Sequence, residues 1–138
     1  MKTVFADAGY WFALINPHDG LRPKATAVSK RLGRCRIVTT EMVLTEVLNH
    51  FADKGQQLRK NALDVVKKLR SDPNLTIQPQ THEQFSRALA RYEQRPDKKW
   101  SLTDCASFLA MDEEEIRDAL AHDEHFQQAG FRALLRED

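Results

Sequence analysis

Short apolar runs alternate along the chain with longer segments in which apolar residues recur at helical spacing. This alternation is the strongest constraint on its fold. Runs of three to five apolar or β-branched residues predict strands, and longer segments with apolar residues at helical spacing predict helices. Strands that alternate with helices favour an α/β domain, in which helices cover both faces of a parallel sheet. The expected strands are 3–6, 36–39, 75–77, 119–121 and 132–135, and the expected helices are 10–15, 21–32, 41–55, 58–69, 81–92, 101–109 and 124–129.

The 138 residues are expected to form a single domain, 1–138, because the sequence has no internal repeat, low-complexity tract or long linker. A chain of this length buries roughly two thirds of the surface of its unfolded form, so it needs no disulfide to fold. Cys35 and Cys105 stand alone, without disulfide or zinc-site spacing. No apolar run approaches the ~18 residues of a membrane span. Asp7 comes too early for a signal peptide, so a cytoplasmic protein is expected.

Charge is unevenly distributed although the net charge is only +1. Residues 1–96 contain 16 basic and 9 acidic side chains, whereas residues 97–138 contain 5 and 11. A basic body with an acidic end suits a polyanion partner, and an ordinary solvated surface explains the same pattern equally well. The strongest basic stretch consists of Arg22, Lys24, Lys30, Arg31, Arg34 and Arg36.

Four acids, Asp7, Glu46, Asp104 and Asp123, lie among apolar or small residues. Acids are rarely buried unless they are paired or bind a metal. Asp7 and Asp123 each follow an expected strand, where the sites of open parallel sheets lie. Carboxylates that gather in one place repel each other unless a cation neutralises them, and all-oxygen sites suit Mg²⁺ or Mn²⁺.

Each acid also has a purely structural interpretation. Asp7 and Asp123 can cap the helices that they precede, and Asp104 can be the third residue of a capping box opened by Ser101. Glu46 can lie at the exposed edge of its helix. The spacing of the four acids alone leaves both interpretations open.

The four acids in their local settings resemble a PIN domain, specifically the VapC-type nucleases of toxin–antitoxin pairs. The resemblance extends over essentially the whole chain. It rests on the segments Phe5 to Asn16, Thr45 to Asn49, Trp100 to Phe108 and Ala121 to Phe131. The last two segments are the most specific, because many neighbours match as well as the acids.

This resemblance implies a PIN-like three-layer α/β sandwich with a central parallel sheet flanked by helices. It implies a ribonuclease that hydrolyses RNA phosphodiesters by metal-activated water, with Mg²⁺ or Mn²⁺ held by Asp7, Glu46, Asp104 and Asp123. Asp123 is ranked below the others as a ligand. The family commonly has Thr or Ser two residues before this acid, where the chain has Ala121. The implied partners are an RNA substrate, a small antitoxin protein and a second copy of the chain, with no membrane.

Two other functions fit the same acids: a non-catalytic PIN-fold module that binds RNA or protein, and a housekeeping PIN nuclease. A phospho-accepting signalling domain fits the order of the acids poorly. His122 and His125 flank Asp123, but imidazole is a poor ligand for Mg²⁺. Trp11 and Phe12 are expected in the core or at a partner surface rather than in a base-stacking platform.

Overall fold

The strands form one sheet in the computed structural model, which describes residues 1–137. All neighbouring strands are parallel, in the order β3-β2-β1-β4-β5. The strands are β1 (Thr3–Ala6), β2 (Arg36–Thr40), β3 (Leu75–Gln78), β4 (Asp118–Leu120) and β5 (Arg132–Ala133). The helices are α1 (Ala8–Ile15), α2 (Arg22–Leu32), α3 (Glu41–Phe51), α4 (Gln56–Ser71), α5 (His82–Gln94), α6 (Leu102–Glu113) and α7 (Glu124–Gln128).

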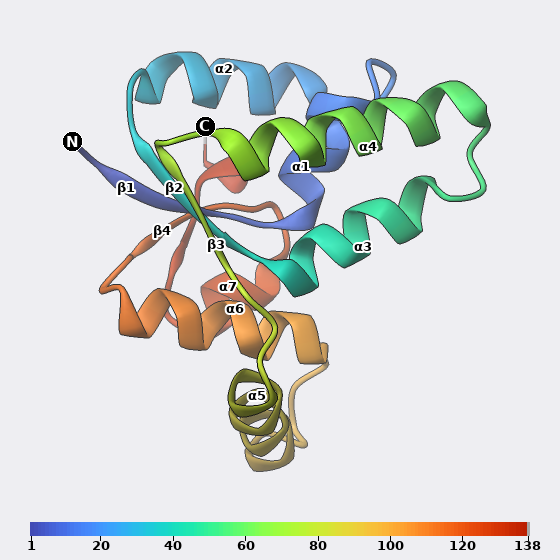
Figure 1. Ribbon diagram of the computed structural model, residues 1–138. Coiled ribbons are helices and arrows are strands. Elements are labelled where there is room, and N and C mark those ends of the chain that lie inside the picture. Colours follow the sequence, from blue (N-terminus) through green and yellow to red (C-terminus); the bar gives the residue numbers. More distant parts are fainter. Residues whose placement is uncertain (138) are drawn as a thin grey trace.

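Helices cover the sheet from both sides, so the molecule has the three layers that were expected (Figure 1). Helices α1, α2 and α4 lie on one face, where α1 contacts both of the others. Helices α6 and α7 contact each other on the opposite face, and α5 packs outside α6. Helix α3 runs away from the carboxyl edge of the sheet and pairs with α4. Within residues 1–137 no helix is both long and apolar enough to cross a membrane.

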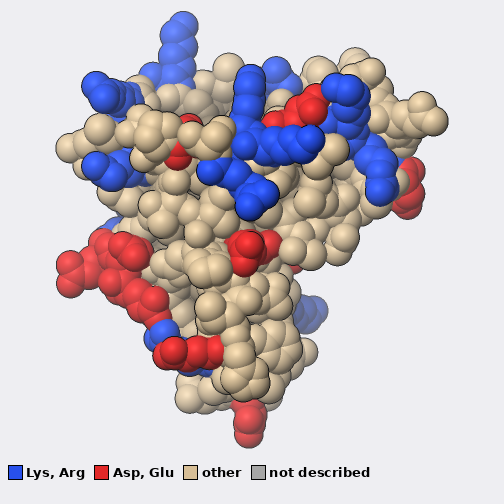
Figure 2. Space-filling view, viewed as in Figure 1, with Lys and Arg blue, Asp and Glu red and all other residues tan. Residues whose placement is uncertain are grey.

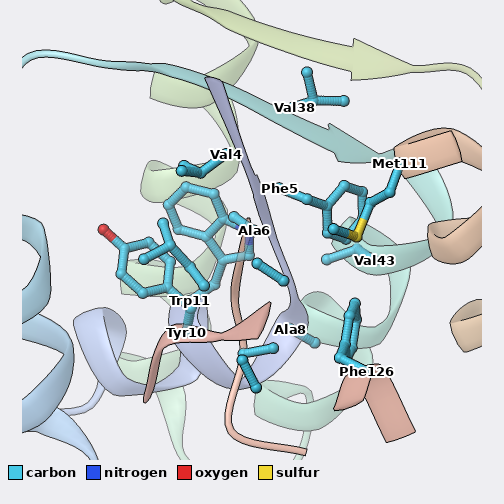
Figure 3. Packing of buried hydrophobic residues seen from close by; sticks show 14 of the residues in the cluster. Val4, Phe5, Ala6, Ala8, Tyr10, Trp11, Val38, Val43, Met111 and Phe126 are labelled. Atoms are coloured by element: carbon cyan, nitrogen blue, oxygen red, sulfur yellow. The ribbon is translucent and has the colours of Figure 1, made fainter. Parts of the chain in front are cut away.

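Strand β1 is the centre of the core, because it lies between β2 and β4 and is covered on both faces. Val4, Phe5 and Ala6 are completely buried. Successive side chains of a strand point to opposite faces, so Val4 lies toward Trp11 of α1 while Phe5 lies toward Met111 of α6 (Figure 3). The chain that leaves this strand at Asp7 therefore starts from a rigid position.

The elements agree with the sequence prediction except at some ends. Helix α3 ends at Phe51 rather than near residue 55, and β4 begins at Asp118. The expected strand 132–135 is a strand only at 132–133 and continues as a 3₁₀ turn, Leu134–Arg136. Leu134 and Leu135 are both buried, so this apolar segment meets the core through a tight turn rather than through one face of a strand.

Ion pairs with Lys2 and Arg132 compensate the burial of Asp118, the first residue of β4.

A buried threonine fixes the end of β1. The hydroxyl of Thr39 donates a hydrogen bond to the carbonyl of Ala6 over 2.9 Å. Thr39→Val leaves this carbonyl without its partner in a buried place and is expected to lower the free energy of unfolding by about 1–2 kcal/mol. Urea denaturation measures the change. Thr76→Val, on the exposed side of β3, is the control, and equal losses in both variants would contradict the assigned role of the Thr39 bond.

Candidate active site

The four acids singled out from the sequence line a single cavity of about 310 Å³ at the carboxyl edge of the sheet. They come from four segments: the end of β1, the middle of α3, the first turn of α6 and the start of α7. The complete lining is Asp7, Ala8, Gly9, Phe12, Glu46, Lys99, Ser101, Asp104, His122, Asp123 and His125. Parallel strands bring these segments together because their carboxyl ends share one edge.

Asp7 is held by the backbone on both sides of its side chain. Its N–H donates to the carbonyl of Leu120 over 3.1 Å, and its own carbonyl accepts from Tyr10 in the first turn of α1. Asp7 occupies the N-cap position of α1, but its side chain makes no capping hydrogen bond. The interpretation of Asp7 as a side-chain cap is therefore wrong, and its carboxylate lines the cavity.

Asp104 and Asp123 do cap helices, and they meet in space as well. Ser101 and Asp104 form the expected capping box of α6, with both bonds at 3.0 Å. Asp123 accepts from the N–H of His125 at the start of α7. The ring atom Nδ1 of His125 lies 2.9 Å from Asp104 and 3.2 Å from Asp123. The acids therefore serve as caps and as members of one polar cluster.

These three side chains offer ligand atoms that all lie within 4.8 Å of one another. The side chain of Asp104 is 10% exposed and that of Asp123 is 41% exposed. Asp104 thus belongs to the floor of the cavity and Asp123 to its mouth. Carboxylate oxygens are the donors that hard divalent cations prefer, so Asp104 and Asp123 fit such an ion, whereas the imidazole of His125 suits it less and pairs with the two acids.

Glu46 completes the acidic lining from α3. It is half-buried rather than at the exposed edge of the helix. Burial raises the pKa of Glu46, and the negative charges of Asp104 and Asp123 raise it further. A hydrogen bond with the side chain of Thr103 opposes this rise.

The electrostatic cost of the cluster is largest at Asp7. Loss of hydration on burial raises the pKa of Asp7 to about 8. Asp104, Glu46 and Asp123 add to this rise through their charge, and a hydrogen bond from the N–H of Ala8 opposes it. Four carboxylates in one cavity therefore favour either a bound proton or a bound cation.

The residues that line the cavity differ in part from those that the sequence predicts. None of the six residues of the basic stretch from Arg22 to Arg36 lines the cavity, whose only lysine or arginine within residues 1–137 is Lys99. Lys99 was missed because it lies in a loop without periodicity; its place just before the segment of Asp104 was the available signal. Trp11 is buried as expected, but Phe12 lines the cavity. Ala121 is fully buried and offers no hydroxyl to Asp123.

The same arrangement of elements occurs in a solved toxin. The crystal structure of Mycobacterium tuberculosis VapC20, a toxin that cleaves the sarcin-ricin loop, matches this chain with a TM-score of 0.83. The match covers 94% of this chain and 97% of VapC20, at 22% sequence identity. The chain has the fold of a VapC-type PIN protein. The PIN-like three-layer sandwich expected from the sequence is thereby confirmed. No protein-family model and no curated protein sequence matches the chain.

The raised pKa of Asp7 makes stability depend on pH in this VapC-type fold. The folded state holds the proton of Asp7 up to about pH 8, whereas the unfolded chain releases it near pH 3.8. Without metal, this contribution to stability is complete below pH 3.8 and is lost as the pH rises through about 8. Asp7→Asn removes the charge, so at pH 8 in EDTA it is expected to stabilise the protein by on the order of 1 kcal/mol.

Thermal unfolding from pH 4 to pH 8 measures this effect, and the advantage of Asp7→Asn should shrink toward pH 4. Asp64→Asn is the control, because Lys60 bonds to the exposed Asp64 and lowers its pKa. A variant Asp7→Asn that is less stable than the original protein at pH 8 would contradict the repulsion described here.

Proposed function

We propose that this protein is a metal-dependent ribonuclease that hydrolyses RNA phosphodiesters, and that it acts as the toxin of a toxin–antitoxin pair. The observation that carries the proposal is the meeting of Asp7, Glu46, Asp104 and Asp123 in one cavity. Capping explains two of these acids singly but does not explain why all four line the same small space. The VapC fold supports the same reaction class.

In the proposed mechanism Asp7, Glu46 and Asp104 would hold a divalent cation, and the more exposed Asp123 would contribute less to its binding. Such an ion would supply positive charge beside the phosphodiester and would activate water for its hydrolysis. His125 would donate a hydrogen bond from Nδ1 to Asp104 and lies 3.2 Å from Asp123, so it would keep the two acids close together. Lys99, at the rim, attracts the phosphate of the substrate. No side-chain nucleophile is needed.

Several finer points belong to this proposal. The cation is Mg²⁺ or Mn²⁺, both of which prefer oxygen ligands. By the resemblance to VapC toxins, the partners are an antitoxin protein that inhibits cleavage and a second copy of the chain, in the cytoplasm. The exposed apolar side chains available for such contacts are Leu48, Leu63, Phe85, Leu89 and Tyr92. Helix α1 contributes little to such contacts because most of it is buried.

The proposal is tested by cleavage of end-labelled RNA by the purified protein, with Mg²⁺, with Mn²⁺ and with EDTA. Cleavage is expected with metal and not with EDTA. Asp7→Asn and Asp104→Asn are each expected to lower the rate by about 10²-fold or more, because each removes a ligand charge at the reacting phosphate. Asp64→Asn, an exposed acid of α4, should leave the rate unchanged.

Undiminished cleavage by Asp7→Asn would refute the assigned site. Metal titration by calorimetry separates the remaining functions. A non-catalytic module is indicated if the protein neither cleaves RNA nor binds Mn²⁺ at these acids. Growth arrest on expression, relieved by a co-expressed antitoxin, distinguishes a toxin from a housekeeping nuclease with the same acids.

A further inference from the structure

An aromatic pair beside the acidic cavity has no part in the mechanism described so far. The rings of Phe12 on α1 and His50 on α3 are stacked, with centroids 4.0 Å apart and planes inclined by 16°. Phe51, which is buried, contacts both rings at nearly perpendicular orientation, 5.8 Å from Phe12 and 4.8 Å from His50. The pair therefore has a firm support in the core.

The pair extends the wall of the cavity toward the surface. Phe12 lines the cavity together with Asp7 and Glu46. His50 follows Glu46 by four residues on α3 and so lies on the same face of the helix, about 6 Å further along its axis. The imidazole thus lies about one helical turn from Glu46, a separation that one nucleotide can bridge.

The outer face of the His50 ring is available to a ligand. The three centroid distances place Phe51 nearly at a right angle to the stacking direction, and hence beside the edge of the imidazole. His50 is exposed, and within residues 1–137 no further ring stacks on it and no side chain or backbone group forms a hydrogen bond with it. Stacking on Phe12 occupies only one of the two faces.

We propose that the outer face of His50, backed by Phe12, stacks on an unpaired nucleobase next to the scissile phosphate of the RNA. The inference rests on the proposed ribonuclease function and assigns His50 and Phe12 a positioning role in it. Bases in single strands and loops are free to stack on aromatic rings, whereas bases inside an A-form duplex are not. The preferred substrate is therefore single-stranded or looped RNA.

Charge favours a base over a phosphate at this place. Glu46, one turn from His50, repels a phosphate but not an uncharged base. The base face carries no net charge, and the ring nitrogens of His50 can also bond to a base edge. Lys99 lies elsewhere on the cavity lining and suits the phosphate. His50 and Phe12 are thus positioning residues, which orient the strand without touching the reacting atoms.

The test uses a single-stranded RNA oligonucleotide whose cleavage position has been mapped, and versions with one abasic nucleotide on either side of that position. For the original protein, one of the two abasic RNAs is expected to lower kcat/KM about tenfold. His50→Ala should lower kcat/KM of the intact RNA about as much, mainly through KM, and should be insensitive to that abasic nucleotide. His50→Phe, which keeps a ring that can stack, should restore most of the loss.

His82→Ala, which removes an exposed imidazole from α5, is the control and should behave as the original protein. An unchanged kcat/KM in His50→Ala, or an abasic penalty that persists in full in this variant, overturns the stacking role. Fluorescence anisotropy of a labelled mixed-sequence single-stranded RNA in EDTA measures the affinity of the protein for RNA without cleavage, and so tests the base contact with His50. Equal affinities of His50→Ala and the original protein there also overturn it, whereas cleavage by Asp7→Asn refutes only the proposed function.

Discussion

The burial of a carboxylate among three other acids is the constraint on which the rest of this structure depends. Asp7 has a pKa of about 8 because it is buried and because three other acids share its cavity. Such a cluster disperses unless its members are attached to elements that cannot move apart. The central strand β1, in which Val4, Phe5 and Ala6 are completely buried, ends directly at Asp7, and the capping box at the start of α6 includes Asp104. The packing of the sheet and helices thus offsets the free energy that is needed to bring the carboxylates together.

Secondary structure and site are linked through the caps. The interaction that starts α6 also holds one oxygen of Asp104, and the interaction that starts α7 holds Asp123. His125 then joins the two acids through Nδ1. The orientation of Asp104 and Asp123 is therefore set by backbone hydrogen bonds together with this imidazole.

The charged side chains on the surface are also separated by sign. On the face shown in Figure 2, lysines and arginines gather mostly over α2 and α4, away from the acidic α5–α6 half.

The sequence predicts the sheet, the order of the helices and the four acids, because these depend on local apolar patterns and on a resemblance carried by short segments. Capping and convergence are alternatives in the sequence, but for Asp104 and Asp123 both are true, because the oxygen that caps each helix also faces Nδ1 of His125. His125 was undervalued because only its affinity for a metal was considered, and not its bonds to the acids. The Phe12–His50 stack depends on how α1 packs against α3, which no spacing within either segment reveals.

The charges of the cavity act differently on a phosphate and on an uncharged base. A phosphodiester that enters beside four carboxylates meets only one lysine on the lining, so without a cation its approach is unfavourable. A divalent ion bound at the acids would reduce the net negative charge of the cavity and weaken this repulsion, and by linkage a bound phosphate would strengthen the binding of the ion. Stacking of an uncharged base on His50 is free of this repulsion. In the proposed ribonuclease, a base stacked on His50 would therefore hold RNA at the rim whether or not an ion is bound.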